Sequence, residues 1–80
     1  MTNQDIPERL VRIFRDQLRQ PTLQLNASTT PDDVSGWDST AMASIIMSIE
    51  EEFGFEMSAA ELRSARSVGD LANIVAQHPE

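Results

Sequence analysis

The stretch DSTAMASIIMSIEEEFG, residues 38–54, carries the strongest helical pattern in the chain. Its large apolar residues recur at intervals of three and four positions, which places them on one face of an α-helix. They are Met42, Ile45, Ile46, Ile49 and Phe53. Gly54 suits the left-handed conformation that commonly ends a helix. The pattern therefore predicts a helix over residues 39–53, with Asp38 or Ser39 as its N-cap.

The residues before this stretch predict another amphipathic helix, because their large apolar side chains share one helical face. These side chains belong to Ile6, Leu10, Ile13, Phe14 and Leu18. Asp5 suits the N-cap, and Pro7 fits the first turn because the N–H that proline lacks would have no helical partner there. A first helix is therefore predicted over about residues 5–19, and Pro21 closes the segment.

Two shorter helices are predicted after the central one. Ser58 and Glu61 have the spacing of a capping box, which favours a short helix over residues 59–65. A final apolar pattern predicts a helix over residues 68–77, although Gly69 weakens its first turn by about 1 kcal/mol relative to alanine. The apolar residues of this pattern are Val68, Leu71, Ala72 and Val75.

Residues 20–38 show no sustained apolar period and are expected to form a long loop. A loop of this length in a small domain is typically packed or functional, and its isolated apolar residues are expected to pin it onto the core. They are Leu23, Leu25, Val34 and Trp37. The triplet Pro31-Asp32-Asp33 suits a short helical turn. No segment alternates with period two, so the prediction is a single all-α domain over residues 1–80. Its architecture is a four-helix bundle of three principal helices and one short helix.

The size and composition of the chain favour a carrier, binding or adaptor domain. With 80 residues, the chain is near the lower limit for independent folding, and an enclosed catalytic cleft is hard to build at this size. The chain has no cysteine, so disulfides and thiolate metal sites are unavailable, which fits a reducing compartment such as the cytoplasm. No apolar run approaches the ~20 residues of a membrane span, and no signal-peptide pattern opens the chain.

The net charge of −7 is unevenly distributed along the sequence. Between Asp32 and Glu61 there are eight acidic residues and no basic one, whereas the first twenty residues contain four arginines. The acidic segment repels phosphate backbones and anionic lipid, so nucleic-acid and membrane roles are not expected. It would attract partners with basic surfaces, or it serves only to keep the protein in solution.

Enzyme chemistry finds little support in the sequence. A nucleophilic Ser39 would need a base, but the chain has no lysine, and its one histidine, His78, lies near the C-terminus. The G-x-S-x-G pattern of a nucleophile elbow is absent around Ser39. Glu50, Glu51 and Glu52 are consecutive and spread around a helix, so they cannot converge on one metal ion. We therefore predict neither a catalytic set nor a metal site.

Two roles remain open for Ser39 on local physical grounds. A serine at a helix start is most often an N-cap, worth about 1 kcal/mol. The less common alternative is that it accepts a covalent group, because the helix N-terminus stabilises a phosphodiester and the preceding loop gives another enzyme access. If Asp38 caps the helix instead, the Ser39 hydroxyl is left free for that second role.

The pattern Asp38-Ser39, followed by an apolar-periodic helix that ends in Ile49-Glu50-Glu51-Glu52-Phe53-Gly54, resembles the acyl carrier proteins. The resemblance covers nearly the whole chain: a first helix, a long loop, the Asp-Ser pair, an acidic second helix, a short third helix and a final helix. It implies that a phosphopantetheinyl transferase transfers 4′-phosphopantetheine from coenzyme A to Ser39. The arm's thiol then carries acyl groups as thioesters, and the protein itself is a non-catalytic carrier, expected to be a monomer.

The resemblance also implies which residues face partner enzymes. Asp38 belongs to the pair that the transferase and other partners read, and Thr40 follows the attachment site. Met47 falls where the family has an exposed apolar contact, and Glu50 and Glu51 fall among its acidic partner-facing positions. The periodicity independently turns Met47 about 100° from Ile46 and about 200° from Ile45, so at least partial exposure is expected. The alternative is a methionine that covers the edge of the core.

Departures from the family pattern point to a specialised member. Thr40 replaces the usual leucine, and Ala41 and Ser44 occupy positions that are often acidic in fatty-acid carriers. Together with Gly36-Trp37 and the polar ends of the chain, these residues suggest a discrete carrier of a dedicated lipid, polyketide-like or related pathway. Its expected partners are acyl-loading, condensing or acyl-transferring enzymes with basic surfaces. The alternatives are an aminoacyl or peptidyl carrier and an unmodified acidic helical interaction domain.

Overall fold

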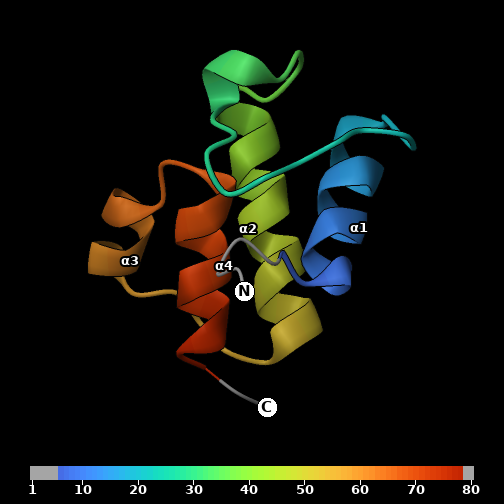
Figure 1. Ribbon diagram of the computed structural model, residues 1–80. Coiled ribbons are helices and arrows are strands. Elements are labelled where there is room, and N and C mark those ends of the chain that lie inside the picture. The colour runs from blue at the N-terminus through green and yellow to red at the C-terminus, as the bar shows by residue number, and fades with distance from the viewer. Residues whose placement is uncertain (1–5, 79–80) are drawn as a thin grey trace.

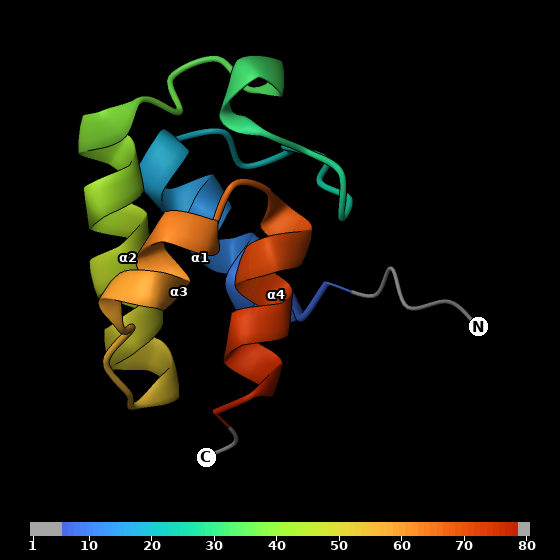
Figure 2. The ribbon, with the colours of Figure 1, turned by 90° about the vertical axis from the view of Figure 1, so that its left-hand side faces the viewer.

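A computed structural model describes residues 6–78. All regular elements in that range are helical: α1 (Glu8–Leu18), the 3₁₀ turn η1 (Pro31–Asp33), α2 (Ser39–Phe53), α3 (Ala59–Ser64) and α4 (Val68–Ala76). Helices α2 and α4 run roughly in one direction and α1 in the opposite one, with the short α3 to one side (Figures 1 and 2). The predicted all-α bundle of three principal helices and one short helix is confirmed, and so is the helical turn at Pro31.

The core of the bundle combines the apolar faces of α1, α2 and α4. Its fully buried large side chains are Leu10, Phe14, Ile45, Ile49, Val68 and Leu71. On α2, the predicted stripe divides into a buried centre and partly buried edges, since Met42 and Ile46 only pack against the core. Burial of this stripe provides the main driving force that orients α2.

The start of α1 corrects the sequence-based boundary. The helix was expected from about residue 5 with Pro7 in its first turn, but it begins at Glu8 and Pro7 is its N-cap, with φ −54° and ψ 137°. The Pro7 carbonyl accepts hydrogen bonds from the N–H groups of Leu10 and Val11, each at 3.0 Å. Proline disfavours helical backbone in the residue before it, so Ile6 stays outside the helix while still packing on the core. The predicted N-cap, Asp5, lies outside the described residues.

Helices α1 and α2 end in the same way. In each, a left-handed residue follows the helix, Arg19 (φ 57°) after α1 and Gly54 (φ 73°) after α2. The next N–H then bonds back five residues, from Gln20 to the Arg15 carbonyl and from Phe55 to the Glu50 carbonyl. This is the Schellman arrangement, which satisfies the otherwise unpaired carbonyls of a last turn. It ends α1 one residue before the predicted boundary, which was residue 19.

The two shorter helices begin at the predicted residues, α3 at Ala59 and α4 at Val68. The Ser58 hydroxyl accepts from the Glu61 N–H while the Glu61 carboxylate accepts from the Ser58 N–H, forming the expected capping box. Ser67 caps α4 through the Asp70 N–H. Each helix ends one residue earlier than predicted, α3 at Ser64 and α4 at Ala76, which is within the fraying of a last turn.

The long loop between α1 and α2 is tied to the start of α4. The N–H groups of Val68 and Gly69 donate to the carbonyls of Thr29 and Ala27, each at 2.9 Å. A Cβ on Gly69 would lie 2.7 Å from the Ala27 carbonyl oxygen, closer than such contacts occur. Glycine is therefore required at this position by the close approach of the loop backbone, and the helix-weakening residue noted in the sequence serves a packing role.

His78 is held by contacts that the sequence did not reveal. Its Nε2 lies 2.7 Å from the Glu61 Oε2, and its ring stacks on Phe55 with centroids 4.1 Å apart and planes inclined by 6°. Phe55 belongs to the α2–α3 connection and Glu61 to α3. These contacts therefore tie the C-terminal end of α4 to both segments.

The Glu61 contacts predict a dependence of stability on pH. The hydrogen bond from the Ser58 N–H and then that of His78 hold the pKa of the Glu61 carboxyl below its ordinary 4.5. A lowered carboxyl pKa means that its stabilising effect is present above pH 4.5 and is lost as pH falls through the folded-state value. We expect the stability difference between wild type and Glu61→Gln, measured by urea unfolding, to be clear at pH 7 and to shrink in strong acid.

Glu56 provides the matched control for this measurement. It is exposed and makes no hydrogen bond to another described residue. Glu56→Gln should show no comparable pH-dependent difference. An equal difference for Glu61→Gln at pH 7 and in acid would show that the carboxylate form is not what stabilises the protein.

Candidate functional site

Ser39 is the first residue of α2, and its hydroxyl is not used in capping the helix. The cap is Asp38, whose Oδ1 accepts the Ala41 N–H at 2.9 Å. Ser39 is exposed, and its side chain makes no hydrogen bond to any residue within 6–78. Of the two N-caps considered from the sequence, Asp38 fills the role, so the neighbouring hydroxyl is accessible to a reagent or an enzyme.

Trp37 fixes the position of the Asp38-Ser39 pair. Its side chain is 4% exposed and packs edge-on against Phe14 of α1, with ring centroids 4.9 Å apart and planes inclined by 81°. The indole N–H points at the Met42 sulfur, 3.2 Å away, one turn into α2. An aromatic anchor directly before the helix cap joins the start of α2 to the core. The start of α2 is therefore attached to the core through Trp37.

The turn before Trp37 gives the chain the geometry that this anchor needs. Gly36 has φ +87°, a left-handed conformation that side chains disfavour. The Trp37 N–H closes a turn onto the Val34 carbonyl at 3.3 Å, and the Gln20 side-chain amide donates to the Ser35 carbonyl at 2.7 Å. The Gln20 contact holds the end of the loop against the residues that directly follow α1.

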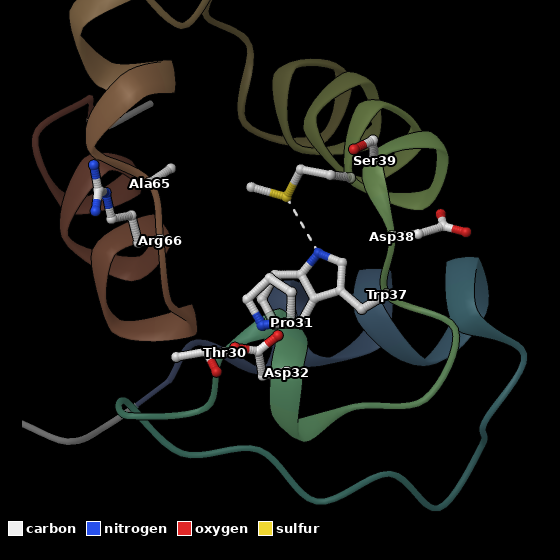
Figure 3. Close-up of a pocket in the computed structure, with 9 residues that line it drawn as sticks. Thr30, Pro31, Asp32, Trp37, Asp38, Ser39, Ala65 and Arg66 are labelled. Atoms are coloured by element: carbon white, nitrogen blue, oxygen red, sulfur yellow. Dashed lines mark hydrogen bonds between the residues drawn. The ribbon is translucent and has the colours of Figure 1, made fainter.

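An open cleft of about 650 Å³ adjoins Ser39 (Figure 3). One side is formed by Thr30, Pro31 and Asp32 at η1. Another is formed at the start of α2 by Trp37, Asp38, Ser39 and Met42. The third side comes from Ala65 and Arg66 in the connection between α3 and α4. Trp37 and Met42 supply apolar surface inside the cleft, whereas the Asp38 carboxylate points away from Ala65 and Arg66.

The described residues that line the cleft beside Ser39 include no histidine or lysine. His78 follows the C-terminal end of α4, which lies at the opposite end of the bundle from the start of α2 (Figure 1). Within residues 6–78, no cluster of three or more potential ligands could hold a metal ion. The same part of the chain contains no helix with the length and apolar character needed to span a bilayer. An accessible hydroxyl without a neighbouring histidine suits an acceptor of a group that another enzyme transfers.

The three consecutive glutamates at the end of α2 lie in different environments. Glu52 pairs with Arg9 of α1, at 2.6 Å between Oε2 and Nε. Glu50 is partly buried, and its Oε2 accepts the Met57 N–H at 2.9 Å, which helps to hold the α2–α3 connection. Glu51 is exposed. The three carboxylates therefore do not converge on one point. This agrees with the prediction from their consecutive positions in a helix.

The predicted partner-facing residues lie on two parts of α2. Met47 is 61% exposed, in agreement with its place off the buried stripe. Together with Glu50 and Glu51 it lines a shallow depression near the end of α2. Asp38 and Thr40 are exposed at the other end of the helix, beside Ser39. The sequence-based analysis did not find Arg66 as a neighbour of the site, because no periodic signal places the α3–α4 connection across from Ser39.

Comparisons with known proteins agree with this geometry. The model of a family described as "Phosphopantetheine attachment site" matches residues 8–75. The chain is 34% identical over 73 residues to "Acyl carrier protein" from Clostridium acetobutylicum, which covers 91% of this chain and 95% of the relative. It is 34% identical over 70 residues to "Acyl carrier protein MbtL" from Mycolicibacterium paratuberculosis, covering 88% and 79%. The solution structure of holo acyl carrier protein from Geobacter metallireducens superimposes with a TM-score of 0.83 at 30% identity, covering 89% of this chain and 82% of that one.

Proposed function

Since this chain belongs to the acyl carrier proteins of the phosphopantetheine-attachment family, whose covalent cofactor is 4′-phosphopantetheine, we propose that Ser39 is the attachment residue. The observation that carries the proposal is the division of roles between two neighbours. Asp38 caps α2, and the exposed Ser39 hydroxyl is left without a hydrogen bond to the described residues. Esterification of a serine that caps the helix would weaken its oxygen as an acceptor of the cap hydrogen bond, whereas Ser39 makes no such bond.

The residues around Ser39 fit a phosphodiester. The N-terminus of α2 begins at Ser39, where backbone N–H groups and the helix dipole favour negative charge. The adjoining cleft offers an open path of about 650 Å³ for the arm. Because the sequence has no cysteine, the arm would supply the thiol on which acyl groups are carried as thioesters. The chain's own residues would position that arm and present it to other enzymes.

The modification requires a separate enzyme as catalyst. A phosphopantetheinyl transferase would bring coenzyme A to the exposed start of α2, where the Ser39 hydroxyl attacks the β-phosphorus and 3′,5′-adenosine bisphosphate leaves. Intact-mass analysis after incubation with coenzyme A and a broad-specificity transferase tests this directly. The expected result is a single addition of one phosphopantetheinyl group, located by peptide mapping to Ser39. An unchanged mass would refute the proposal.

We further propose that the carrier serves a dedicated lipid, polyketide-like or related pathway. Its support is the surface around the attachment site, where the exposed Thr40 provides a hydroxyl in place of an apolar contact and Ala41 and Ser44 carry no charge. Partners that recognise this end of α2 would therefore meet a less acidic surface than the one farther along the helix.

The docking surface at the end of α2 leads to a separate prediction. Met47 and Glu51 are both exposed and line one depression, so they could offer a partner an apolar anchor beside a negative charge. In the double variant Met47→Ala, Glu51→Lys, we expect the KM of the transferase to rise about tenfold, or about 1.4 kcal/mol, with little change in kcat. Steady-state loading assays measure this effect.

Glu8→Lys is the control for the effect of net charge. Glu8 is exposed on α1, and its substitution alters the net charge by the same amount as Glu51→Lys. A similar rise in KM for Glu8→Lys would mean that overall charge, and not the surface at Met47 and Glu51, controls the encounter.

A further inference from the structure

We propose, on the basis of the proposed function of Ser39, that Arg66 binds an anionic group that the arm brings into the cleft. The anion would be either the phosphodiester of the arm or a carboxylate on the carried acyl group, since both present oxygen atoms to a guanidinium in the same way. Arg66 and Ser39 lie on different sides of the cleft (Figure 3). An arm attached at Ser39 therefore has Arg66 as a neighbour across that space.

The charges of the cleft single out Arg66. It is the only basic residue among those that line the cleft, and it follows a segment, from Asp32 to Glu61, that has no basic residue at all. Of the two acidic residues that line the cleft, Asp38 points its carboxylate away from Arg66 and uses it to cap α2. Asp32 is exposed beside Pro31 on the η1 side. Arg66 thus lies on the side of the cleft opposite the start of α2. Its guanidinium is turned away from Ser39 in Figure 3, so rotation of this exposed side chain is needed to bring it to the arm.

The Arg66 side chain is not committed to another contact. Its backbone N–H is held by the Asp70 carboxylate at 2.9 Å, but its guanidinium makes no hydrogen bond or ion pair with another residue of the described range. By contrast, Arg9 bridges to Glu52, and the Arg15 Nε donates to the Leu23 carbonyl. The five N–H donors of Arg66 are therefore available to a ligand while its backbone position is fixed.

The apolar part of the cleft strengthens such an interaction. Trp37 and Met42 give the cleft apolar surface, and a charge-assisted hydrogen bond formed beside such surface is stronger than one in bulk water. An uncharged acyl chain could use the same apolar surface but would leave the guanidinium without a partner. The structure therefore favours an anionic occupant over a neutral one of equal length.

The test compares three forms of the protein loaded at Ser39 by a transferase from coenzyme A derivatives. They carry the arm with a free thiol, the arm with a butanoyl group and the arm with a succinyl group. The readout is the NMR resonance of the Arg66 Nε–H. If the phosphodiester is the ligand, the resonance moves when the arm alone is attached; if the cargo carboxylate is the ligand, it moves only in the succinyl form. Either result supports the inference.

Two outcomes would overturn it. One is an Arg66 resonance that is the same in the unmodified protein and in all three loaded forms. The other is an equal shift for butanoyl and succinyl that is absent with the arm alone, which would report the bulk of the cargo and not its charge.

Arg63→Gln is the matched control for Arg66→Gln. Arg63 is exposed on α3, does not line the cleft, and its substitution changes the net charge by the same amount. If Arg66 binds the anion, the loaded form that carries this anion should melt at a higher temperature than the unmodified protein. This rise in melting temperature should be lost in Arg66→Gln and kept in Arg63→Gln. A rise that persists in Arg66→Gln contradicts the inference.

Mass mapping of each loaded form separates this inference from the proposed function. An arm found on a residue other than Ser39 refutes both. An arm found on Ser39 together with an unaffected Arg66 refutes the anion site alone.

Discussion

Ser39→Ala is expected to abolish addition of the phosphopantetheine arm while leaving the free energy of unfolding within about 1 kcal/mol of wild type. The chemical reason is that alanine has no hydroxyl to esterify. The structural reason is that Asp38 caps α2, so no intramolecular hydrogen bond is lost with the Ser39 hydroxyl. Intact mass after transferase treatment and urea unfolding of the same sample measure the two effects.

Two neighbouring substitutions make this prediction specific. Thr40→Ala removes the adjacent exposed hydroxyl and should still be loaded, whereas a mass gain that survives in Ser39→Ala but not in Thr40→Ala would move the attachment site by one residue. Asp38→Ala should show a different pattern. It removes the cap and lowers stability by about 1 kcal/mol but keeps the acceptor hydroxyl.

Phe14→Ala is expected to cause the largest loss of stability, about 3–5 kcal/mol. The ring is fully buried and packs edge-on against Trp37, so its removal leaves a cavity where α1 meets the end of the long loop. A domain of this size has only a few kcal/mol of total stability, so much of the variant should be unfolded at 25 °C. Circular dichroism during urea or thermal unfolding measures the loss.

Phe14→Leu serves as the comparison, because it keeps an apolar side chain at the position and leaves a smaller cavity. It should fold and lose clearly less stability than Phe14→Ala. If both variants unfold at the wild-type midpoint, the contact between Phe14 and Trp37 does not support the start of α2 as the structure indicates.

The parts of the fold that the sequence predicted are those determined by local chemistry. The 39–53 stripe has a strict helical period, Gly54 provides a left-handed stop, and Ser58 with Glu61 forms a capping box; each of these signals lies within one element. Their boundaries were therefore predicted to within a residue. The start of α1 was placed too early, because the apolar period was extended through Pro7 without allowing for its effect on Ile6.

The features that the sequence did not reveal depend on contacts between distant segments. From the sequence, Gly69 was expected only to weaken the first turn of its helix. The path of the loop past Ala27 shows why a glycine is needed there. The sequence showed only that His78 lies near the C-terminus, whereas in the structure it contacts Phe55 and Glu61. The position of Arg66 across from Ser39 depends on how α3 packs, and no local pattern encodes that packing.

The candidate site shows the same division. The helical pattern limited the N-cap to two adjacent residues, but choosing between them required the hydrogen bond from the Ala41 N–H to the Asp38 carboxylate. Exposure of Met47 followed from helical geometry alone. The different contacts of Glu50 and Glu52 did not, since they involve Met57 in the next connection and Arg9 on another helix.

The anchoring of Trp37 has an optical consequence. The sequence contains one tryptophan and no tyrosine, so fluorescence excited at wavelengths that phenylalanine does not absorb arises from this one indole. That indole borders the cleft beside Ser39 and touches the sulfur of Met42. Its emission wavelength and quenching therefore depend on whether water or another group fills the cleft. The protein thus carries its own fluorescent reporter of cleft occupancy, which requires no added dye.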